Sequence, residues 1–269
     1  MPANWTHIFF PNTTKTITRW FYDLVTHYDT DVHVVLMNYG YIDLDTSAPL
    51  IPLSGHDEKL RYQIQLYHHI AQAADWSGRD ALEVGSGRGG GASYVMRTFR
   101  PHSLTGLDLS TRAVRFCKRH FADIPGLSFV HGDAETLHFP DASFDIVLNV
   151  ESSLYYPNVE GFLRSVHRVL KPGGTFLYAD MRYLEQVETW RTQIRAAGFD
   201  VILEEDITPN ARAALALDQK KRLELIDRYV PKFLHGPFLK FAGTKHQLAE
   251  GTTPKPGERV YFNFVLKKL

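Results

Sequence analysis

Cysteine is nearly absent from this sequence, since Cys117 is the only one among 269 residues. A single thiol cannot form an intramolecular disulfide, and disulfide frameworks are typical of oxidising compartments. We therefore expect a cytoplasmic protein. Its length suits one large domain, or one domain with an appended cap, that buries a full hydrophobic core.

An excess of either charge is also missing, because 30 Lys and Arg residues balance 30 Asp and Glu residues. Proteins that bind a long nucleic-acid tract normally carry a basic excess, so we expect no nucleic-acid partner. No apolar run is long enough to span a bilayer, and the N-terminus lacks a signal-peptide pattern, so we expect no stable membrane insertion. The adjacent His68 and His69 point in different directions on an expected helix, and we expect no metal site.

What the sequence does contain is a glycine-rich turn after a short apolar run, in the segment DALEVGSGRGGGASY at 80–94. Gly85, Gly87 and Gly90 fit the pattern G-x-G-x-x-G, in which the backbone approaches a ligand closely and then enters a helix. The amides at the start of such a helix favour negative groups of a ligand. The turn alone does not separate a ligand site from an ordinary tight turn, so the surrounding segments decide.

Beyond residue 80, expected strands alternate with expected helices. This alternation predicts an α/β fold with a mostly parallel sheet and helices on both faces. The last expected strand, 260–266, is antiparallel and lies on the edge side of the sheet. The expected helices cover the ranges 57–74, 90–99, 111–122, 158–170 and 184–197.

Residues 1–56 are expected to form an N-terminal arm and a helical lid, outside a main domain at 57–269. Apolar residues recur at three- and four-residue steps between 13 and about 33, which predicts an amphipathic helix. This helix packs over the sheet edge, covers the active site, or is exchanged with a second subunit in a homo-oligomer. The sequence leaves these three alternatives open.

Four segments follow the glycine-rich turn in a fixed order. They are 103–110 with Asp108, 130–140 with Asp133, 143–151 with Asn149 and Glu151, and 169–180. In this order and spacing, the chain from about residue 60 to its end resembles the class I S-adenosylmethionine-dependent methyltransferases. The resemblance implies a Rossmann-like fold with a seven-stranded sheet, S-adenosylmethionine as cofactor and S-adenosylhomocysteine as product. It also implies that the largely helical residues 210–248 form an insertion before the last strand that shapes the acceptor pocket.

Acidic residues follow the strands where such a cofactor would need them. Asp108 stands 18 residues after Gly90, where a carboxylate accepts hydrogen bonds from both ribose hydroxyls of a nucleoside. The resemblance places Glu83 near the methionine end of the cofactor. An acid there would repel a pyrophosphate but suits an ammonium and a sulfonium, so a nicotinamide-dependent reductase is the weaker alternative. The residues expected to bind the cofactor are Tyr39, Glu83, Gly85, Ser86, Gly87, Asp108, Leu109, Asp133, Ala134, Asn149 and Val150.

Tyr39 belongs to an Asn-aromatic-Gly-aromatic block at 38–41, upstream of the glycine-rich turn. This block resembles one in the small-molecule branch of the family, which includes sugar O-methyltransferases and sterol C-methyltransferases. In that branch the block closes over the methionine end of the cofactor. The alternative is that Tyr39 and Tyr41 are core aromatic residues.

The segment NVESSLYYP at 149–157 follows the fourth expected strand. It resembles the acceptor-facing loop of the phthiotriol and phenolphthiotriol dimycocerosate methyltransferases, which O-methylate long-chain lipids. Many O-methyltransferases of this branch carry a histidine where this sequence has Leu154. Tyr155 and Glu151, acting through water, are therefore the candidate catalytic residues. Histidines elsewhere that can serve instead are His138, His235 and His246.

Three acceptor chemistries stay open. A carboxylate is already ionised and needs no base, a hydroxyl needs one, and an alkene carbon would form a carbocation that aromatic faces can stabilise. Aromatic residues near the acceptor indicate a lipophilic substrate such as a lipid, terpenoid or polyketide-derived metabolite. O-methylation leads on the family likeness, C-methylation of a prenyl carbon is the runner-up, and a catalytically idle binding module is the last alternative. The residues expected to bind the substrate are Tyr22, Leu154, Tyr156, Tyr183, Phe238 and Phe241.

Overall fold

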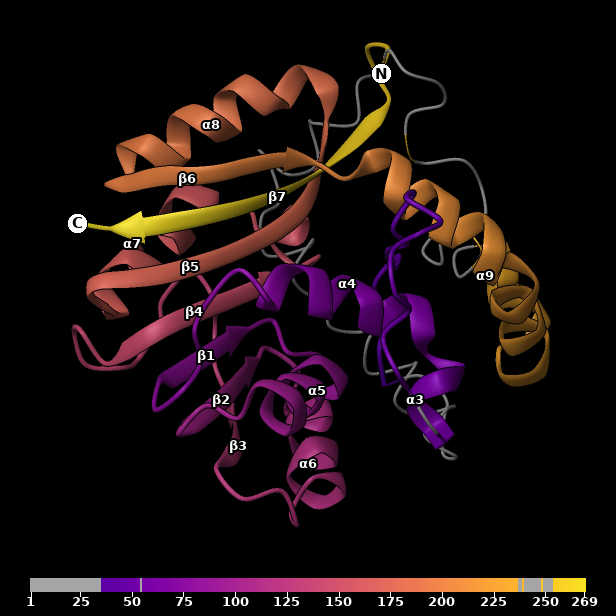
Figure 1. Cartoon of the computed structure of the whole chain (residues 1–269), viewed down its shortest axis with the longest axis horizontal. Helices are drawn as coiled ribbons and strands as arrows, with labels where there is room; N and C mark the ends of the chain where they lie inside the picture. The colour runs from indigo at the N-terminus through magenta and orange to yellow at the C-terminus, as the bar shows by residue number, and fades with distance from the viewer. Residues whose placement is uncertain (1–34, 54, 237–238, 240–247, 249–253) are drawn as a thin grey trace.

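The structure is a computed structural model, and it describes residues 35–53, 55–236, 239, 248 and 254–269. The expected N-terminal helix lies outside the described residues, as do Tyr22, Phe238, Phe241 and His246. The described part is organised around one twisted sheet with helices on both of its faces (Figure 1).

Seven strands form this sheet in the order β3-β2-β1-β4-β5-β7-β6. The first five in that order pair in parallel, whereas β7 is antiparallel to both of its neighbours. This topology confirms the predicted α/β fold with a mostly parallel seven-stranded sheet. The strands are β1 (Asp80–Val84), β2 (Ser103–Asp108), β3 (Leu127–His131), β4 (Phe144–Val150), β5 (Leu170–Tyr183), β6 (Phe199–Asp206) and β7 (Arg259–Lys268).

The position of the last strand differs from the prediction. β7 is antiparallel, as expected, but it lies between β5 and β6, so that β6 forms the edge of the sheet. Burial follows this order, because β7 is buried over most of its length while β6 leaves most of its side chains exposed or half-buried. An edge strand has one unpaired side and covers less of the core than an interior strand.

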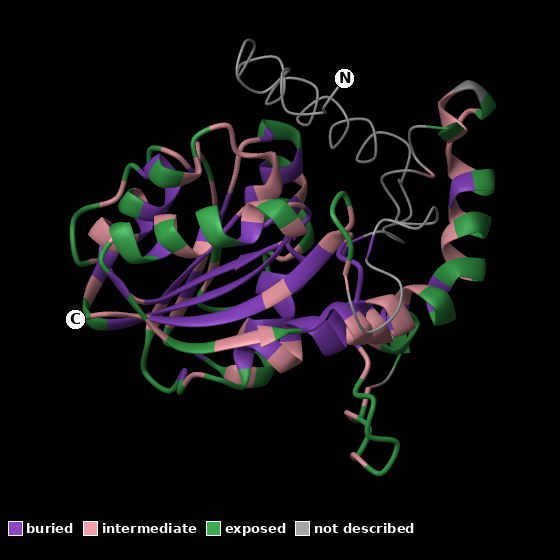
Figure 2. Ribbon diagram, turned by 90° about the horizontal axis from the view of Figure 1, so that it is seen from above, coloured by how far each residue is buried: buried purple, intermediate pink, exposed green. Residues whose placement is uncertain are grey.

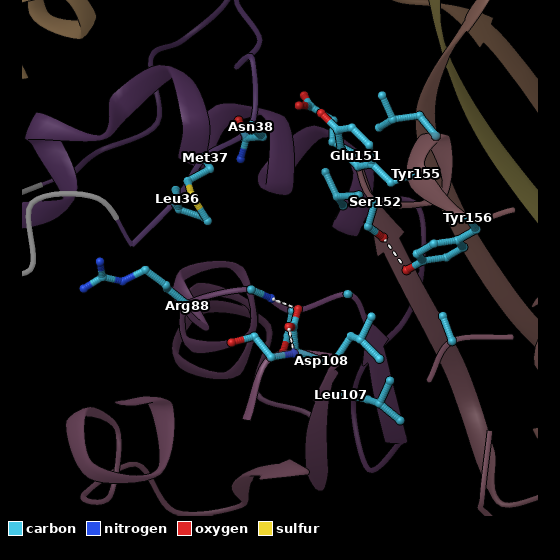
Figure 3. Close-up of a pocket in the computed structure, with 18 of the residues that line it drawn as sticks. Leu36, Met37, Asn38, Arg88, Leu107, Asp108, Glu151, Ser152, Tyr155 and Tyr156 are labelled. Carbon is cyan, nitrogen blue, oxygen red and sulfur yellow. Dashed lines mark hydrogen bonds between the residues drawn. The ribbon is translucent and has the colours of Figure 1, made fainter. Parts of the chain in front are cut away.

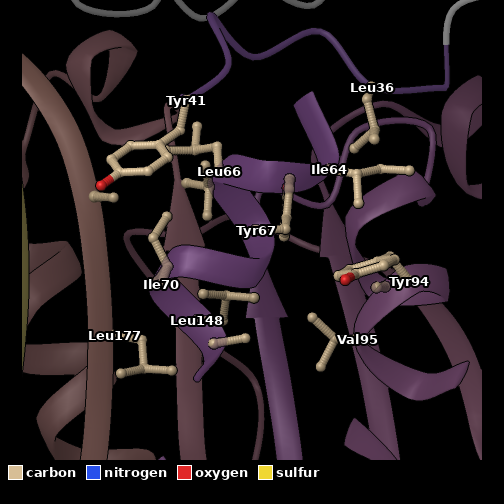
Figure 4. Packing of buried hydrophobic residues seen from close by; sticks show 14 of the residues in the cluster. Leu36, Tyr41, Ile64, Leu66, Tyr67, Ile70, Tyr94, Val95, Leu148 and Leu177 are labelled. Carbon is tan, nitrogen blue, oxygen red and sulfur yellow. The ribbon is translucent and has the colours of Figure 1, made fainter. Parts of the chain in front are cut away.

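The helices divide into two layers, each packed on its own cluster of buried apolar residues. In the first cluster, Ile64 and Ile70 of α4 and Val95 of α5 pack toward Leu148 and Leu177 of the sheet (Figure 4). The second cluster joins α7 and α8 to the opposite face of the same strands. Figure 2 shows the buried strands between helices whose outer sides are exposed. These helices are α4 (Arg61–Ala71), α5 (Gly90–Phe99), α6 (Thr111–His120), α7 (Val159–Val169) and α8 (Val187–Ala196).

Two expected helices are each divided in the structure. The range 57–74 contains the end of α3 (Gly55–Lys59) and all of α4, and the range 184–197 contains η2 (Leu184–Gln186) and α8. The predicted helical insertion begins with α9 (Thr208–Tyr229), which is followed by η3 (Lys232–Leu234). α9 lies beside α4 (Figure 1), where Gln63 Nε2 donates a hydrogen bond to Asp218.

A substitution of Phe162 measures how much one residue of the second cluster contributes to the free energy of unfolding. The Phe162 side chain is fully buried, and its ring contacts those of Tyr156, Phe176 and Tyr178. We expect Phe162→Ala to lower the free energy of unfolding by about 3–5 kcal/mol, because it leaves a cavity in a packed core. Urea denaturation followed by circular dichroism measures the change.

The matched control for this prediction is Arg164→Ala on the exposed side of the same helix. It should change the free energy of unfolding by no more than about 0.5 kcal/mol. Equal losses in the two variants would contradict the assignment of Phe162 to the core.

Candidate active site

A cavity of about 1130 Å³, including the space at its mouth, opens at the carboxyl ends of β1, β2 and β4 (Figure 3). Ligands bind at this edge of open α/β sheets. The residues of the predicted site that line it are Tyr39, Gly85, Ser86, Gly87, Asp108, Leu109, Asp133, Ala134, Val150, Glu151, Leu154, Tyr155 and Tyr156.

The glycine-rich turn shapes one wall of the cavity. Gly85 and Gly87 have φ angles of 76° and 52°, which L side chains rarely adopt. A Cβ atom on Gly85 would lie 2.3 Å from Ser152 Oγ, whereas one on Gly87 would meet only Met37 Cε at 3.7 Å. Gly85 therefore allows close packing against the loop after β4, while Gly87 keeps its own side of the cavity open for a ligand.

Asp108 holds the turn and faces the same cavity. Its Oδ2 accepts a hydrogen bond from the Gly87 N–H at 2.8 Å, and its Oδ1 accepts one from the Ser110 N–H at 2.8 Å (Figure 3). A carboxylate oxygen can accept more than one hydrogen bond. Asp133 and Ala134, which follow β3, lie on the same wall.

Glu83 and Asn149 support the site from behind its surface. Neither lines the cavity, and their exposed fractions are 1% and 0%. Glu83 Oε1 accepts a hydrogen bond from the hydroxyl of Tyr67 at 2.7 Å, and burial raises the pKa of Glu83 to about 7. Asn149 Nδ2 donates to the carbonyl of Val84 at 2.8 Å, which fixes the end of β1.

Glu151 occupies the opposite end of the cavity. It has a φ of 51°, an uncommon angle for a residue with a side chain, and such angles cluster at functional sites. Its Oε1 accepts hydrogen bonds from the Tyr39 N–H at 2.7 Å and the Tyr261 hydroxyl at 2.9 Å. Burial is the main cause that raises the pKa of Glu151 to about 8.

The block at 38–41 packs over the cavity because α4 and α9 hold its backbone. Arg222 of α9 donates to the carbonyl of Asn38 at 2.9 Å, and the Tyr41 N–H donates to the carbonyl of Tyr62 at 2.9 Å. Gly40 has a φ of 89°, and a Cβ there would lie 2.9 Å from Tyr62 Cβ. The glycine of the block is therefore required by both backbone angle and close approach.

A buried polar network fixes the loop after β4, which contains η1 (Ser153–Tyr155). Asp180 Oδ2 accepts hydrogen bonds from Ser153 Oγ at 2.6 Å and from the Leu154 N–H at 3.0 Å. Arg182 donates to Ser153 Oγ at 2.8 Å, and its guanidinium lies over the ring of Trp190. These bonds fix the backbone of the loop and so the position from which the Leu154 and Tyr155 side chains reach the cavity.

Several predicted residues do not meet at the cavity. Tyr183 is outside its lining and lies against the Arg259 guanidinium, 5.0 Å from ring centroid to Cζ. Tyr156 reaches the lining, but its hydroxyl is hydrogen bonded to Ser152 Oγ at 2.8 Å, so it supports the loop (Figure 3). His138 and His235 are not lining residues, and the described lining contains no histidine.

The sequence interpretation also missed several lining residues. Leu36 and Met37 precede the aromatic block, and Met181 follows Asp180 in β5; none of them carries a distinctive motif. Tyr67 lies at an apolar position of α4 and therefore has the pattern of a core residue. Among the described residues no group of His, Cys, Asp and Glu could hold a metal ion. Within the same ranges, no helix combines the length and apolar character needed to cross a bilayer.

Comparison with known proteins agrees with this geometry. The family described as "Methyltransferase domain" matches residues 82–178. The phthiotriol/phenolphthiotriol dimycocerosates methyltransferase of Mycobacterium tuberculosis is 39% identical over 242 residues, 90% of this chain and 86% of that protein. The fatty-acid O-methyltransferase of Mycolicibacterium smegmatis is 43% identical over 227 residues, 83% of this chain and 81% of that protein.

The chain therefore belongs to the family of S-adenosylmethionine-dependent methyltransferases. The family resemblance inferred from the motifs is confirmed, and the alternative of a nicotinamide-dependent reductase is no longer supported.

Two solved structures share the fold. The [4+2]-cyclase SpnF is 23% identical with a TM-score of 0.69, covering 93% of this chain and 94% of that one. Geranyl diphosphate C-methyltransferase from Streptomyces coelicolor is 15% identical with a TM-score of 0.63, covering all of both chains.

The raised pKa of Glu151 predicts a pH-dependent stability. Unfolding returns the carboxyl pKa from about 8 to an ordinary value near 4.5. The folded state thus holds this proton more tightly, and its contribution is lost as pH rises from about 4.5 through 8, at about 1.4 kcal/mol per pKa unit. Glu151→Gln removes this titration and keeps an oxygen that accepts both hydrogen bonds.

Urea denaturation of both proteins between pH 5.5 and 9 measures this effect. The free energy of unfolding of wild type, minus that of Glu151→Gln, should fall from pH 5.5 to about pH 8 and level off above it. All other titrating groups are common to the two proteins and cancel in the difference. A difference that stays constant or rises with pH would refute the raised pKa.

Proposed function

We propose that this protein transfers the methyl group of S-adenosylmethionine to an oxygen atom of a lipophilic small molecule. The observation that carries the proposal is the division of the cavity into two chemically different ends. Exposed backbone at Gly85 and Gly87 and the carboxylates of Asp108 and Asp133 form the polar end. The residues around the carboxyl of Glu151 at the other end are mainly apolar or aromatic, namely Tyr39, Leu154, Tyr155 and Met181.

Two further observations support binding of the cofactor at the polar end. Glu83 lies buried behind this end, where an ionised carboxyl attracts a cationic group without reaching the cavity itself. Gly87 leaves open the space that a side chain would fill. In this assignment Asp108 holds the ribose, Asp133 and Ala134 flank the adenine, and the turn holds the methionine end.

The bound cofactor supplies an electrophilic methyl group, and the acceptor oxygen has to lie in line behind it. Holding two reactants in such alignment can remove roughly 7–11 kcal/mol of the barrier. Tyr39, Leu154 and Tyr155 orient the acceptor and exclude water. The Asp180 network contributes indirectly, because it fixes the backbone that carries Leu154 and Tyr155.

Glu151 is the residue that we assign to proton transfer when the acceptor is a hydroxyl. A carboxyl with a pKa of about 8 is close to the operating range of a general base at neutral pH. Burial instead raises the pKa of Tyr155 well above its usual value, so its phenolate is disfavoured. Oxygen is preferred over carbon as the acceptor atom because the relatives that share 39% and 43% identity are named for phthiotriols and for fatty-acid O-methylation.

Product analysis with a labelled methyl donor tests the proposal. We expect methyl ester from a long-chain fatty acid, methyl ether from a long-chain diol, or both, and no methylated carbon from geranyl diphosphate. A carbon-methylated product from the prenyl substrate alone would replace O-methylation by the C-methylation alternative. Absence of S-adenosylhomocysteine binding in calorimetry would reject the whole proposal.

Glu151→Gln separates the two oxygen acceptors. With a hydroxyl acceptor, loss of the base should lower kcat by about 10²–10⁴-fold. With a carboxylate acceptor, which needs no base, kcat should change little. Glu160→Gln, exposed on α7, is the matched control and should leave both rates unchanged. A large loss of kcat with the fatty acid would contradict the role of Glu151 as a base.

A further inference from the structure

Tyr67 lies between the buried Glu83 and the cavity. Its exposed fraction is 6% and it lines the cavity beside Gly85–Gly87, while Glu83 does not reach the lining. The Tyr67 hydroxyl donates a hydrogen bond to Glu83 Oε1 at 2.7 Å. A phenol oxygen that donates in this way can still accept a hydrogen bond from another donor.

The third consecutive glycine of the turn is explained by the same tyrosine. Gly90 completes G-x-G-x-x-G, so the motif makes no demand on Gly91, and Gly91 has an ordinary helical backbone. A Cβ on Gly91 would lie 2.0 Å from Tyr67 Cζ and 2.4 Å from its hydroxyl oxygen. Gly91 therefore leaves room for the Tyr67 ring to cross the first turn of α5 and reach Glu83.

We propose that Tyr67 is the residue that contacts the ammonium group of the cofactor, and that Glu83 acts through it by polarising its hydroxyl. This inference rests on the proposed function, because it assumes that S-adenosylmethionine binds in this cavity. The ammonium donates to the Tyr67 oxygen, whose own proton is directed to the Glu83 carboxylate. Such a chain places negative charge near the cation and keeps the carboxylate buried.

Tyr67→Phe tests the contact, and Tyr94→Phe is its matched control. Both tyrosines are buried, on α4 and α5 (Figure 4), but the Tyr94 hydroxyl is hydrogen bonded to His68 Nδ1 at 2.8 Å and is outside the cavity lining. Calorimetry is carried out with two ligands, S-adenosylhomocysteine and 5′-methylthioadenosine. The second ligand has the nucleoside and the sulfur but lacks the amino acid group.

We expect Tyr67→Phe to weaken S-adenosylhomocysteine binding about 10- to 100-fold, the effect of losing one hydrogen bond to a charged group. Binding of 5′-methylthioadenosine should stay within about twofold, because this ligand has no ammonium to lose. Tyr94→Phe should bind both ligands like wild type. Equal weakening for both ligands would overturn the contact in favour of a purely structural role, and an unchanged affinity for S-adenosylhomocysteine would also overturn it.

Glu83→Gln and the double variant test whether Glu83 acts through Tyr67. If the two side chains work in series, the double variant should bind S-adenosylhomocysteine no more weakly than the worse single variant. Additive losses would show that Glu83 contacts the ligand independently and would overturn the proposal. Failure of wild type to bind S-adenosylhomocysteine would reject both the proposed function and this inference. Binding by wild type together with a contradictory result in the variants would reject only the role of Tyr67.

Gly91→Ala tests whether the Tyr67 ring needs the space that the missing side chain of Gly91 leaves. It should weaken S-adenosylhomocysteine binding in the wild-type background by displacing Tyr67, and cause little further loss in the Tyr67→Ala background. Thermal unfolding of each variant identifies any general loss of the fold. The same loss in both backgrounds would contradict the coupling between Gly91 and Tyr67.

Discussion

The hydrogen bonds that connect the end of β1 to the end of β2 are the contact on which the rest of the site depends. The N–H groups of Gly85 and Ser86 both donate to the carbonyl of Leu107, and the N–H of Gly87 donates to Asp108. These bonds turn the chain sharply away from β1 and aim it into α5. They also bring backbone, carboxylate and helix start to one edge of the sheet, which fixes the polar end of the cavity before any ligand is present.

Burial of acids at this edge opposes the stability of the ligand-free protein. Both Glu83 and Glu151 are pushed toward the neutral form, with pKa values raised to about 7 and about 8. A cation that enters the cavity reverses this preference, because opposite charge favours the ionised carboxyl. We therefore expect binding of a cationic cofactor to be coupled to proton release, so that the unfavourable burial of the acids would favour a positively charged ligand.

The parts of the fold and site that follow from local sequence were predictable, and the parts set by distant contacts were not. The alternation of strands and helices predicts the sheet and the helices on its two faces. The G-x-G-x-x-G pattern identifies Gly85 and Gly87, and both have positive φ angles in the structure. The place of β7 inside the sheet depends on its pairing with β5, about 80 residues away, which no local pattern encodes. Tyr67 was missed because a tyrosine at a core position of an amphipathic helix has the same pattern whether or not its hydroxyl reaches an acid.

The acceptor end shows why a missing histidine does not by itself exclude hydroxyl chemistry. Leu154 stands where a base was expected, yet its backbone is held by Asp180, so the loop keeps its position with an apolar side chain. Glu151, three residues earlier, has its backbone at a φ of 51° and its carboxyl fixed by Tyr39 and Tyr261. A rigid, buried carboxyl with a raised pKa can take over proton transfer, while leucine adds apolar surface for the acceptor. Under the proposed function, Glu151 would serve as the proton acceptor of this loop, and Leu154 would make the loop surface more lipophilic.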